Sequence, residues 1–230
     1  MLRWLAAHKR DTHPLIQQFA TTELPTAQTP IDDCPLLAID LELTGLQPER
    51  DHIVSIGWVP IRRREVVLAD ARHYLIQPPV SVGQSATIHG LHDRDLDNAP
   101  TLDSVLQELL ERYAGYVLVA HNAALDNAFL RAAITRAFGS APALMAIDTL
   151  RIEKRYLTRR DQTFKDDGLR LNACLHRHKL PLASTHNALE DAYSCALLLL
   201  AQIARMNRRH VVLEDLLASG LLEKFTRWLQ

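Results

Sequence analysis

The sequence has few cysteines and no long apolar run. Its three cysteines lie far apart and form no C-x-x-C pair, which argues against a disulfide framework and against a structural zinc site. The longest apolar run, residues 195–201, is far shorter than the roughly 20 residues that a membrane span requires. Charged residues also interrupt the N-terminus before the apolar centre of a signal peptide can form. We therefore expect a cytoplasmic protein that does not associate with membranes.

The chain also lacks an excess of charge of either sign. It has 26 Lys and Arg against 27 Asp and Glu, a net charge of -1, so no global positive field exists to hold long duplex DNA by counterion release. At 47% hydrophobic and 23% charged residues, the composition excludes disordered and fibrous classes. A length of 230 residues allows one ordinary domain with additions, or two very small ones.

The composition changes along the chain and predicts three segments. Residues 1–34 are polar, with prolines and threonines toward their end, and are expected to be an N-terminal extension and linker. Residues 35–206 alternate between apolar strand-like and helical patterns and are expected to form the domain. Residues 207–230 are predicted to be a C-terminal helical extension.

The patterns in the domain favour an α/β fold. Three early strand-like runs are typical of an antiparallel meander, and the later alternation of strand and helix predicts a mixed sheet flanked by helices. Strands are expected at 36–41, 52–61, 65–76, 116–120 and 143–147, and the longer helices at 101–113, 124–138 and 188–205.

Acidic residues stand at the ends of two predicted strands. Asp40 and Glu42 are two residues apart on a strand, so their carboxylates point to the same face. Taken alone, this pair is more often a solvated strand end than a metal site. Asp126 falls in the first turn of the helix after the 116–120 strand, where its alternative role is to stabilise the helix dipole.

A third acidic position begins the most apolar helix. Asn187 and Glu190 resemble a capping box, which places His186 in the preceding loop and Asp191 one turn inside the helix. A carboxylate on such a central helix is costly unless it is paired or binds a metal. The alternative is that an arginine pairs with Asp191 and that His186 is a surface residue.

Considered together, the three positions predict a cation site. A mixed sheet would bring Asp40, Glu42, Asp126, Asp191 and His186 together from strand ends and helix starts. Four carboxylates form a hard oxygen ligand set, for which Mg²⁺ or Mn²⁺ is the natural ion.

These residues resemble the DEDDh family of 3′→5′ exonucleases, the DnaQ-like superfamily of the proofreading (epsilon) subunit of bacterial DNA polymerase III. The resemblance extends over about residues 35–205. It is carried by D-L-E-L-T-G at 40–45, I-H-G-L at 88–91, H-N-A-A-L-D-N-A-F-L at 121–130, D-T-L at 148–150 and H-N-A-L-E-D-A at 186–192. It implies a ribonuclease H-like mixed sheet of five strands.

The resemblance also implies a mechanism. Asp40, Glu42, Asp126 and Asp191 would hold two Mg²⁺ or Mn²⁺ ions, and His186 would be the general base that deprotonates the attacking water. The products would be a 5′-nucleoside monophosphate and a shortened 3′ end.

Further residues are implied to hold the terminal nucleotide. They are Leu43, Thr44, Gly45, His89, Leu91 and Asn122. His89 is a candidate contact near the 3′-hydroxyl, with a plain loop residue as the alternative. Leu43 and Leu125 depart from the residues most common in the family, which leaves the shape of the base pocket open.

The motifs specify the substrate and the partners less closely than they specify the reaction. Single-stranded or frayed DNA is the expected substrate, whereas the opening motif also resembles oligoribonucleases that trim short RNA. The rival from another class is a non-catalytic nucleic-acid or polymerase-binding module. The sequence does not distinguish between a polymerase partner and a homodimer. Basic stretches at 151–160 and 62–64 could guide a phosphate backbone or simply be solvated faces.

Overall fold

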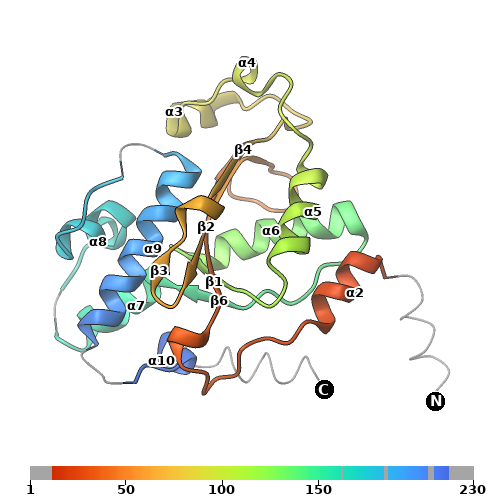
Figure 1. The fold of residues 1–230 in the computed structure, drawn as a ribbon. Helices are drawn as coiled ribbons and strands as arrows, with labels where there is room; N and C mark the ends of the chain where they lie inside the picture. Colours follow the sequence, from red (N-terminus) through yellow and green to blue (C-terminus); the bar gives the residue numbers. More distant parts are fainter. Residues whose placement is uncertain (1–11, 162, 184–185, 207–209, 218–230) are drawn as a thin grey trace.

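A computed structural model describes residues 12–161, 163–183, 186–206 and 210–217 of the chain. A mixed sheet runs through the centre of the molecule, with helices on both of its faces (Figure 1). The strands are β1 (Leu36–Leu43), β2 (Ile53–Arg62), β3 (Glu65–Val66), β4 (Arg72–Leu75), β5 (Val117–Ala120) and β6 (Ala146–Asp148).

The order of strands in the sheet is β3-β2-β1-β5-β6, and β4 also pairs with β2. β1 is antiparallel to β2 and parallel to β5, which in turn is parallel to β6. The carboxyl ends of β1, β5 and β6 therefore meet at one edge of the sheet. This edge is where the acidic motifs at 40–42, 121–126 and 148 leave their strands.

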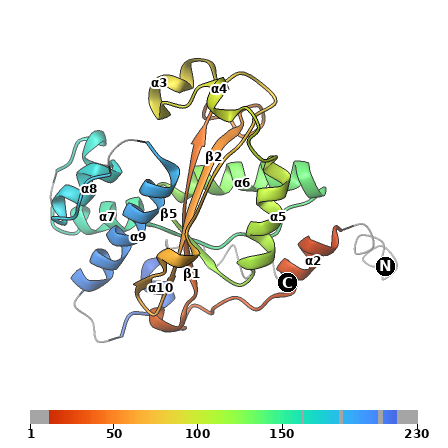
Figure 2. The same ribbon diagram turned by 45° about the horizontal axis from the view of Figure 1, so that its top comes forward.

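Helices cover both faces of the sheet (Figure 2). α9 packs on β1 and β2, and α7 and α8 pack on α9. α5, α6 and α2 lie on the opposite side, where α2 packs on α5 and α5 on α6. The helices are α2 (Pro14–Thr21), α3 (Ala86–His89), α4 (Asp93–Leu96), α5 (Leu102–Arg112), α6 (Ala123–Phe138), α7 (Thr149–Thr158), α8 (Leu171–Arg177), α9 (Ala188–Arg205) and α10 (Leu213–Leu216).

The pleat of β1 divides the core into two halves. Leu37, Ile39 and Leu41 belong to the larger cluster, beside α5 and α6, whereas Leu36 and Ala38 belong to the cluster beneath α9. Because side chains alternate along a strand, Asp40 and Glu42 share the face of Leu36 and Ala38. The strand therefore places both carboxylates on the side of the sheet that carries α9.

The predicted α/β fold with its antiparallel meander is confirmed, with changes in individual elements. The run at 65–76, expected as one strand, is broken into β3, a 3₁₀ turn at Leu68–Asp70 and β4, so the sheet has six strands. β1 extends to Leu43, two residues beyond its predicted end, and therefore includes Glu42. α9 begins and ends where the apolar periodicity predicts.

The two flanking segments contribute to the folded body. Leu15 and Ile16 of α2, in the segment predicted to be an N-terminal extension and linker, are buried in the larger core cluster. Pro30 forms a β-bridge with Val212, and the Ile31 N–H donates to the carbonyl of Val211. The closing helix expected toward the C-terminus lies partly outside the described residues. Among those residues, no helix has the length and apolar character needed to cross a membrane.

Candidate active site

The site is built on the last residues of β1. Asp40 pairs with Gly57 of β2, and Glu42 pairs with Ser55, so the two acids stand side by side along one strand face. A register irregularity between Glu42 and Leu43 ends the regular pairing immediately afterwards. Glu42 is only 7% exposed and Asp40 is half-buried.

The first turn of α9 reaches this face because β2 has a glycine beneath it. A Cβ atom at Gly57 would lie 2.2 Å from the Leu189 nitrogen and 2.3 Å from the Ala188 carbonyl carbon. No other residue has room there, and a glycine inside a strand is typical of such a close backbone approach. The α9 backbone thus lies directly against the partner of Asp40.

The start of α9 is held by its own cap. The Asn187 side-chain oxygen accepts hydrogen bonds from the Leu189 and Glu190 N–H groups, at 3.1 and 3.2 Å. Asn187 therefore performs the capping role that its position predicts. The Asp191 N–H donates to the Asn187 carbonyl, so the carboxylate of Asp191 is fixed one turn inside the helix.

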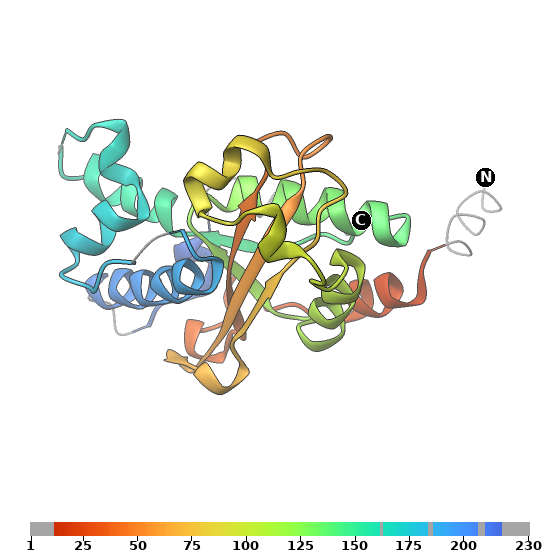
Figure 3. The same cartoon turned by 90° about the horizontal axis from the view of Figure 1, so that it is seen from above.

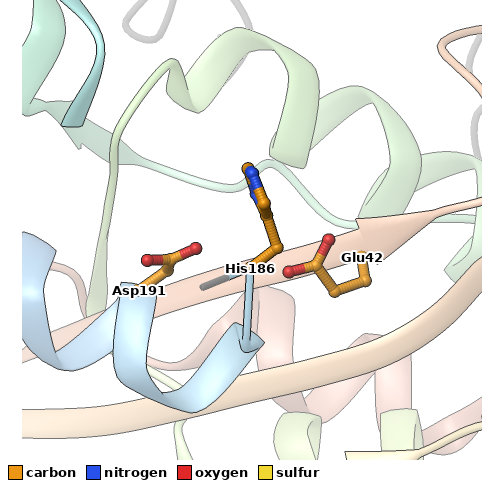
Figure 4. Close-up of side chains that lie close together, drawn as sticks. All are labelled: Glu42, His186 and Asp191. Carbon is orange, nitrogen blue, oxygen red and sulfur yellow. The ribbon is translucent and has the colours of Figure 1, made fainter. Parts of the chain in front are cut away.

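Glu42, His186 and Asp191 converge from two parts of the chain (Figure 4). One ligand atom from each lies within 4.8 Å of the others, a spacing that suits a shared cation. Glu42 comes from the β1 end, Asp191 from the first turn of α9, and His186 from the loop before that helix. His186 is exposed, so its ring is accessible from solvent.

Asp126 completes the acidic cluster, which we define as Asp40, Glu42, Asp126 and Asp191. Asp126 is 7% exposed in the first turn of α6, and its helix begins directly after β5. Asn122 takes a left-handed conformation, with φ of 83°, at the junction between strand and helix. Asparagine tolerates this conformation better than most residues, which allows the sharp turn.

The negative charges of the acidic cluster act on one another. Burial, followed by the charges of Asp126, Asp191 and Glu42, raises the pKa of Asp40 well above its usual range. Burial and the neighbouring Asp191 and Asp126 raise the pKa of Glu42 to about 8. The pKa of Asp191 is also raised, mainly by burial.

The pKa of Asp126 rises to about 7, from burial first and then from the charge of Asp148. Four carboxylates with elevated pKa values cannot all ionise at neutral pH without a compensating positive charge. Their hard oxygen atoms match the preference of Mg²⁺ and Mn²⁺. The residues present therefore fit a divalent cation site.

The residues expected to hold the nucleotide lie at and after the end of β1, in and after α3, and immediately before α6. Thr44 shapes the loop after β1, because its hydroxyl accepts a hydrogen bond from the His52 N–H at 2.9 Å. Gly45 lies against Asp51, whose carboxylate would meet any side chain at position 45. Asn122 is exposed, and Leu91 packs against the small cluster of Val54, Val82 and Leu96.

His89 is buried in α3, close enough to His186 for the charge of that residue to lower its pKa, although burial is the larger cause. Its Nδ1 accepts a hydrogen bond from the Leu91 N–H at 3.1 Å, and its Nε2 lies 3.0 Å from the Ser85 hydroxyl. Because Ser85 donates its own proton to the Val82 carbonyl, His89 Nε2 is the donor in that pair. Both ring nitrogens are therefore engaged inside the loop, and a contact with substrate would require one bond to break.

Two supporting residues received no role from the sequence. Asp148 Oδ1 accepts hydrogen bonds from the Asn122 and Leu150 N–H groups, at 3.2 and 3.0 Å, and so ties β6 to the start of α6. His121 Nε2 donates to the Leu169 carbonyl at 2.7 Å, and its Nδ1 lies 2.9 Å from the Thr149 hydroxyl. Burial lowers the pKa of His121, which keeps the ring neutral for this arrangement. Their motifs were visible, but three of their partners, Asn122, Thr149 and Leu169, lie 26 or more residues away along the chain.

Comparison with known proteins identifies the domain. The RNase T family, described as exonucleases, matches residues 37–199. The chain belongs to this exonuclease family. The match spans β1 to α9 and includes every member of the acidic cluster, in agreement with the DnaQ-like resemblance of the motifs.

Relatives of this exonuclease domain are parts of larger proteins. The chain is 32% identical over 177 residues to DNA polymerase III PolC-type of Thermotoga maritima, covering 76% of this chain and 12% of that protein. It is 26% identical to the 3′-5′ exonuclease DinG of Staphylococcus epidermidis, covering 75% of this chain and 18% of the relative. The chain thus spans less than a fifth of the length of these curated relatives.

Solved structures share the fold. Cell-death related nuclease 4 has a TM-score of 0.66 at 16% identity, covering 80% of this chain and 67% of its own. Exonuclease X, solved in complex with 5′ overhanging duplex DNA, has a TM-score of 0.58 at 22% identity and covers 79% of this chain and 98% of its own. Together they confirm the predicted ribonuclease H-like architecture.

Proposed function

We propose that the protein is a metal-dependent 3′→5′ exonuclease that releases 5′-nucleoside monophosphates. The observation that carries this proposal is the convergence of Glu42, His186 and Asp191 beside Asp40 and Asp126, within a domain of the exonuclease family. An acidic cluster with raised pKa values and an adjacent exposed imidazole is suited to hydrolysing a phosphodiester with the help of divalent cations.

The four acids would hold two Mg²⁺ or Mn²⁺ ions. Such ions supply positive charge at the phosphate and make water a better nucleophile. His186 would accept the proton as the water oxygen attacks phosphorus, and the bond from phosphorus to the 3′-oxygen of the preceding nucleotide would break. That oxygen would take a proton from solvent, which leaves a new 3′-hydroxyl end.

The loop residues after β1 and in α3 would surround the terminal nucleotide. Thr44 and Gly45 follow directly on β1, the strand that carries Asp40 and Glu42, and the 88–91 loop is close to the site through the interaction of His89 with His186. We assign the terminal nucleotide to the space between them, with Leu43, Leu91 and Asn122 at its borders.

Single-stranded or frayed DNA is the proposed substrate. Similar folds have been solved with DNA oligonucleotides, among them E. coli Exonuclease I with a dT13 oligonucleotide and Exonuclease X with duplex DNA. The PolC-type relative suggests that a polymerase is the partner. The three cysteines are buried and free, which suits the reducing interior of the cytoplasm, the location that we propose.

Incubation with 5′-labelled single-stranded DNA and matched RNA tests the reaction. With Mn²⁺ we expect a ladder that shortens from the 3′ end, faster on DNA, and no cleavage with chelator. Faster cleavage of RNA would reassign the substrate to short RNA, and cleavage that persists in chelator would refute the metal-dependent mechanism.

Asp40→Asn is the matched variant for that assay. We expect its activity to fall to the level of the chelated enzyme, while removal of one negative charge from the cluster leaves the melting temperature unchanged or higher. Asp97→Asn, which alters an exposed acid outside the cluster, serves as the control and should retain full activity. Wild-type rates in Asp40→Asn would contradict the assigned role of the cluster.

A further inference from the structure

One segment of the chain is far more basic than the rest. Residues 151–179 contain nine Lys and Arg against four Asp and Glu, a net charge of +5 in a chain whose total is -1. The remaining residues therefore have a net charge of -6. The segment comprises most of α7, the 3₁₀ turn at Asp166–Leu169 and α8, and both helices contact the 3₁₀ turn and α9.

Some of these cations have structural partners. Arg155 donates to the backbone carbonyls of Asp215 and Leu217, Arg177 pairs with buried Glu153, and Arg151 lies 3.5 Å from Asp148. Arg160 lies over the ring of Tyr156. The remaining five are exposed and form no ion pair with any side chain that the structure describes. We call these five the basic face: Lys154, Arg159, Lys165, Arg170 and Lys179.

Hydrogen bonds connect the elements of the basic face to residues near the acidic cluster. Arg170 follows Leu169, whose carbonyl accepts the hydrogen bond from His121 at the end of β5. At the start of α7, Asp148 binds the Asn122 N–H and raises the pKa of Asp126. α7 and α8 lie together next to α9 in all three views (Figure 3).

The second arginine-rich stretch is different. At the tip between β2 and β3, Arg62 pairs with Asp70 and Arg64 pairs with Asp32. These ion pairs neutralise the tip locally, and only Arg63 stays exposed there without a described partner. Of the two stretches, the segment at 151–179 is therefore the one with uncompensated charge.

From these observations we infer that the basic face binds the phosphates of the substrate strand on the 5′ side of the scissile bond. The inference rests on the proposed exonuclease function. The acidic cluster and the net negative charge of the residues outside 151–179 repel a polyanion. A strand therefore needs a local positive surface near the site to be held there. Unpaired, exposed Lys and Arg side chains on consecutive elements suit a backbone that is recognised without regard to sequence.

The test compares two double variants with the same change in charge. Lys154→Gln/Arg159→Gln removes two charges from the basic face, and Arg63→Gln/Arg64→Gln removes two from the β2–β3 tip as the control. Binding of fluorescein-labelled 20-nucleotide single-stranded DNA is measured by anisotropy between 50 and 200 mM salt. Hydrolysis is measured on the same DNA and on the 4-nitrophenyl ester of thymidine 5′-monophosphate, which is too small to reach the basic face.

For the basic-face variant, we expect weaker binding and a salt slope that is less steep by about 1.4. Two phosphate contacts on a single strand contribute about that slope, which corresponds to about 25-fold in affinity at 0.1 M salt. Hydrolysis of the small ester should stay at the wild-type rate, whereas KM for the 20-nucleotide DNA should rise. The control variant should match the wild type in every measurement.

Two results would overturn the inference. Unchanged DNA affinity and salt slope in the basic-face variant would assign the face to another partner, such as an acidic protein surface, and an equal loss in the control would reveal a general charge effect. Failure of the proposed function has a separate signature. In that case the wild type would hydrolyse neither substrate, while the basic-face variant would still bind DNA more weakly.

Discussion

Replacement of Gly57 by alanine should disable the site without touching any of its chemical groups. The added Cβ would lie 2.2 Å from the Leu189 nitrogen and 2.5 Å from the Ala188 carbonyl oxygen. Heavy atoms in contact are about 3.5 Å apart at their optimum, so the backbone must separate by about 1 Å or more. Both neighbours are backbone atoms of the first turn of α9, which cannot rotate away as a flexible side chain would.

The displacement should be transmitted to Asp191. The Asn187 cap and the bond from the Asp191 N–H to the Asn187 carbonyl make this turn a unit, so a shift at Leu189 moves the carboxylate away from Asp40 and Glu42. A misplacement of about 1 Å costs on the order of 100-fold in rate. Overpacking of this kind costs about 1–3 kcal/mol, which for a chain of this size lowers the melting temperature by roughly 2–12 °C.

The assay measures kcat on single-stranded DNA, the melting temperature, and the stabilisation produced by Mg²⁺. Gly168→Ala is the control, because a Cβ there meets its nearest neighbour at 3.7 Å, an ordinary contact. We expect Gly57→Ala to lose activity and most of the Mg²⁺-induced stabilisation, while Gly168→Ala keeps both. A Gly57→Ala protein with wild-type kcat and melting temperature would refute the argument that the close approach of α9 positions Asp191.

Two further predictions concern stability and pH. In chelator, the melting temperature should fall as the pH rises from about 5.5 to 8.5. The pKa values of Glu42 and Asp126 are raised to about 8 and about 7 in the folded state, so the ionisation of these two carboxyls there costs stability across this range. Millimolar Mg²⁺ should restore it at pH 8.5, and a flat profile in chelator would contradict the repulsion described for the cluster. Glu153→Gln should destabilise the protein by about 3 kcal/mol in urea unfolding, since it leaves Arg177 and Arg205 without their buried carboxylate. Burial alone would raise the pKa of Glu153, but hydrogen bonds from His178, Arg205 and Gln202 hold it at about 2. The contribution of Glu153 to stability should therefore be present above about pH 4.5 and be lost as the pH falls toward 2. If Glu153→Gln lost stability in acid along the same curve as the wild type, the hydrogen bonds of Glu153 would contribute little.

Much of the fold was predictable because its signals are local. Three such signals are the apolar run of β1, the helical stripe of α9 and the cap at Asn187. Each depends on residues that are close together in the sequence, and the structure has all three. The break between β3 and β4 was not predicted, since the residues from 65 to 76 read as one continuous β-rich run. The 3₁₀ turn that interrupts them depends on how they pack against β2.

The identity of the acidic residues could likewise be predicted from the sequence, because their motifs combine a carboxylate with a strand end or a helix start. What the chain could not reveal is which distant groups hold them in place. Gly57 lies beneath α9 only because β2 pairs with β1 in the observed register, and the carbonyl of Leu169 meets His121 only when α8 packs on α9. Composition and periodicity encode the chemistry that each segment carries, whereas contacts between segments far apart in the sequence exist only after the sheet and its helices have packed. Tertiary structure therefore decided how closely the four carboxylates approach one another and which Lys and Arg side chains remain without an acidic partner.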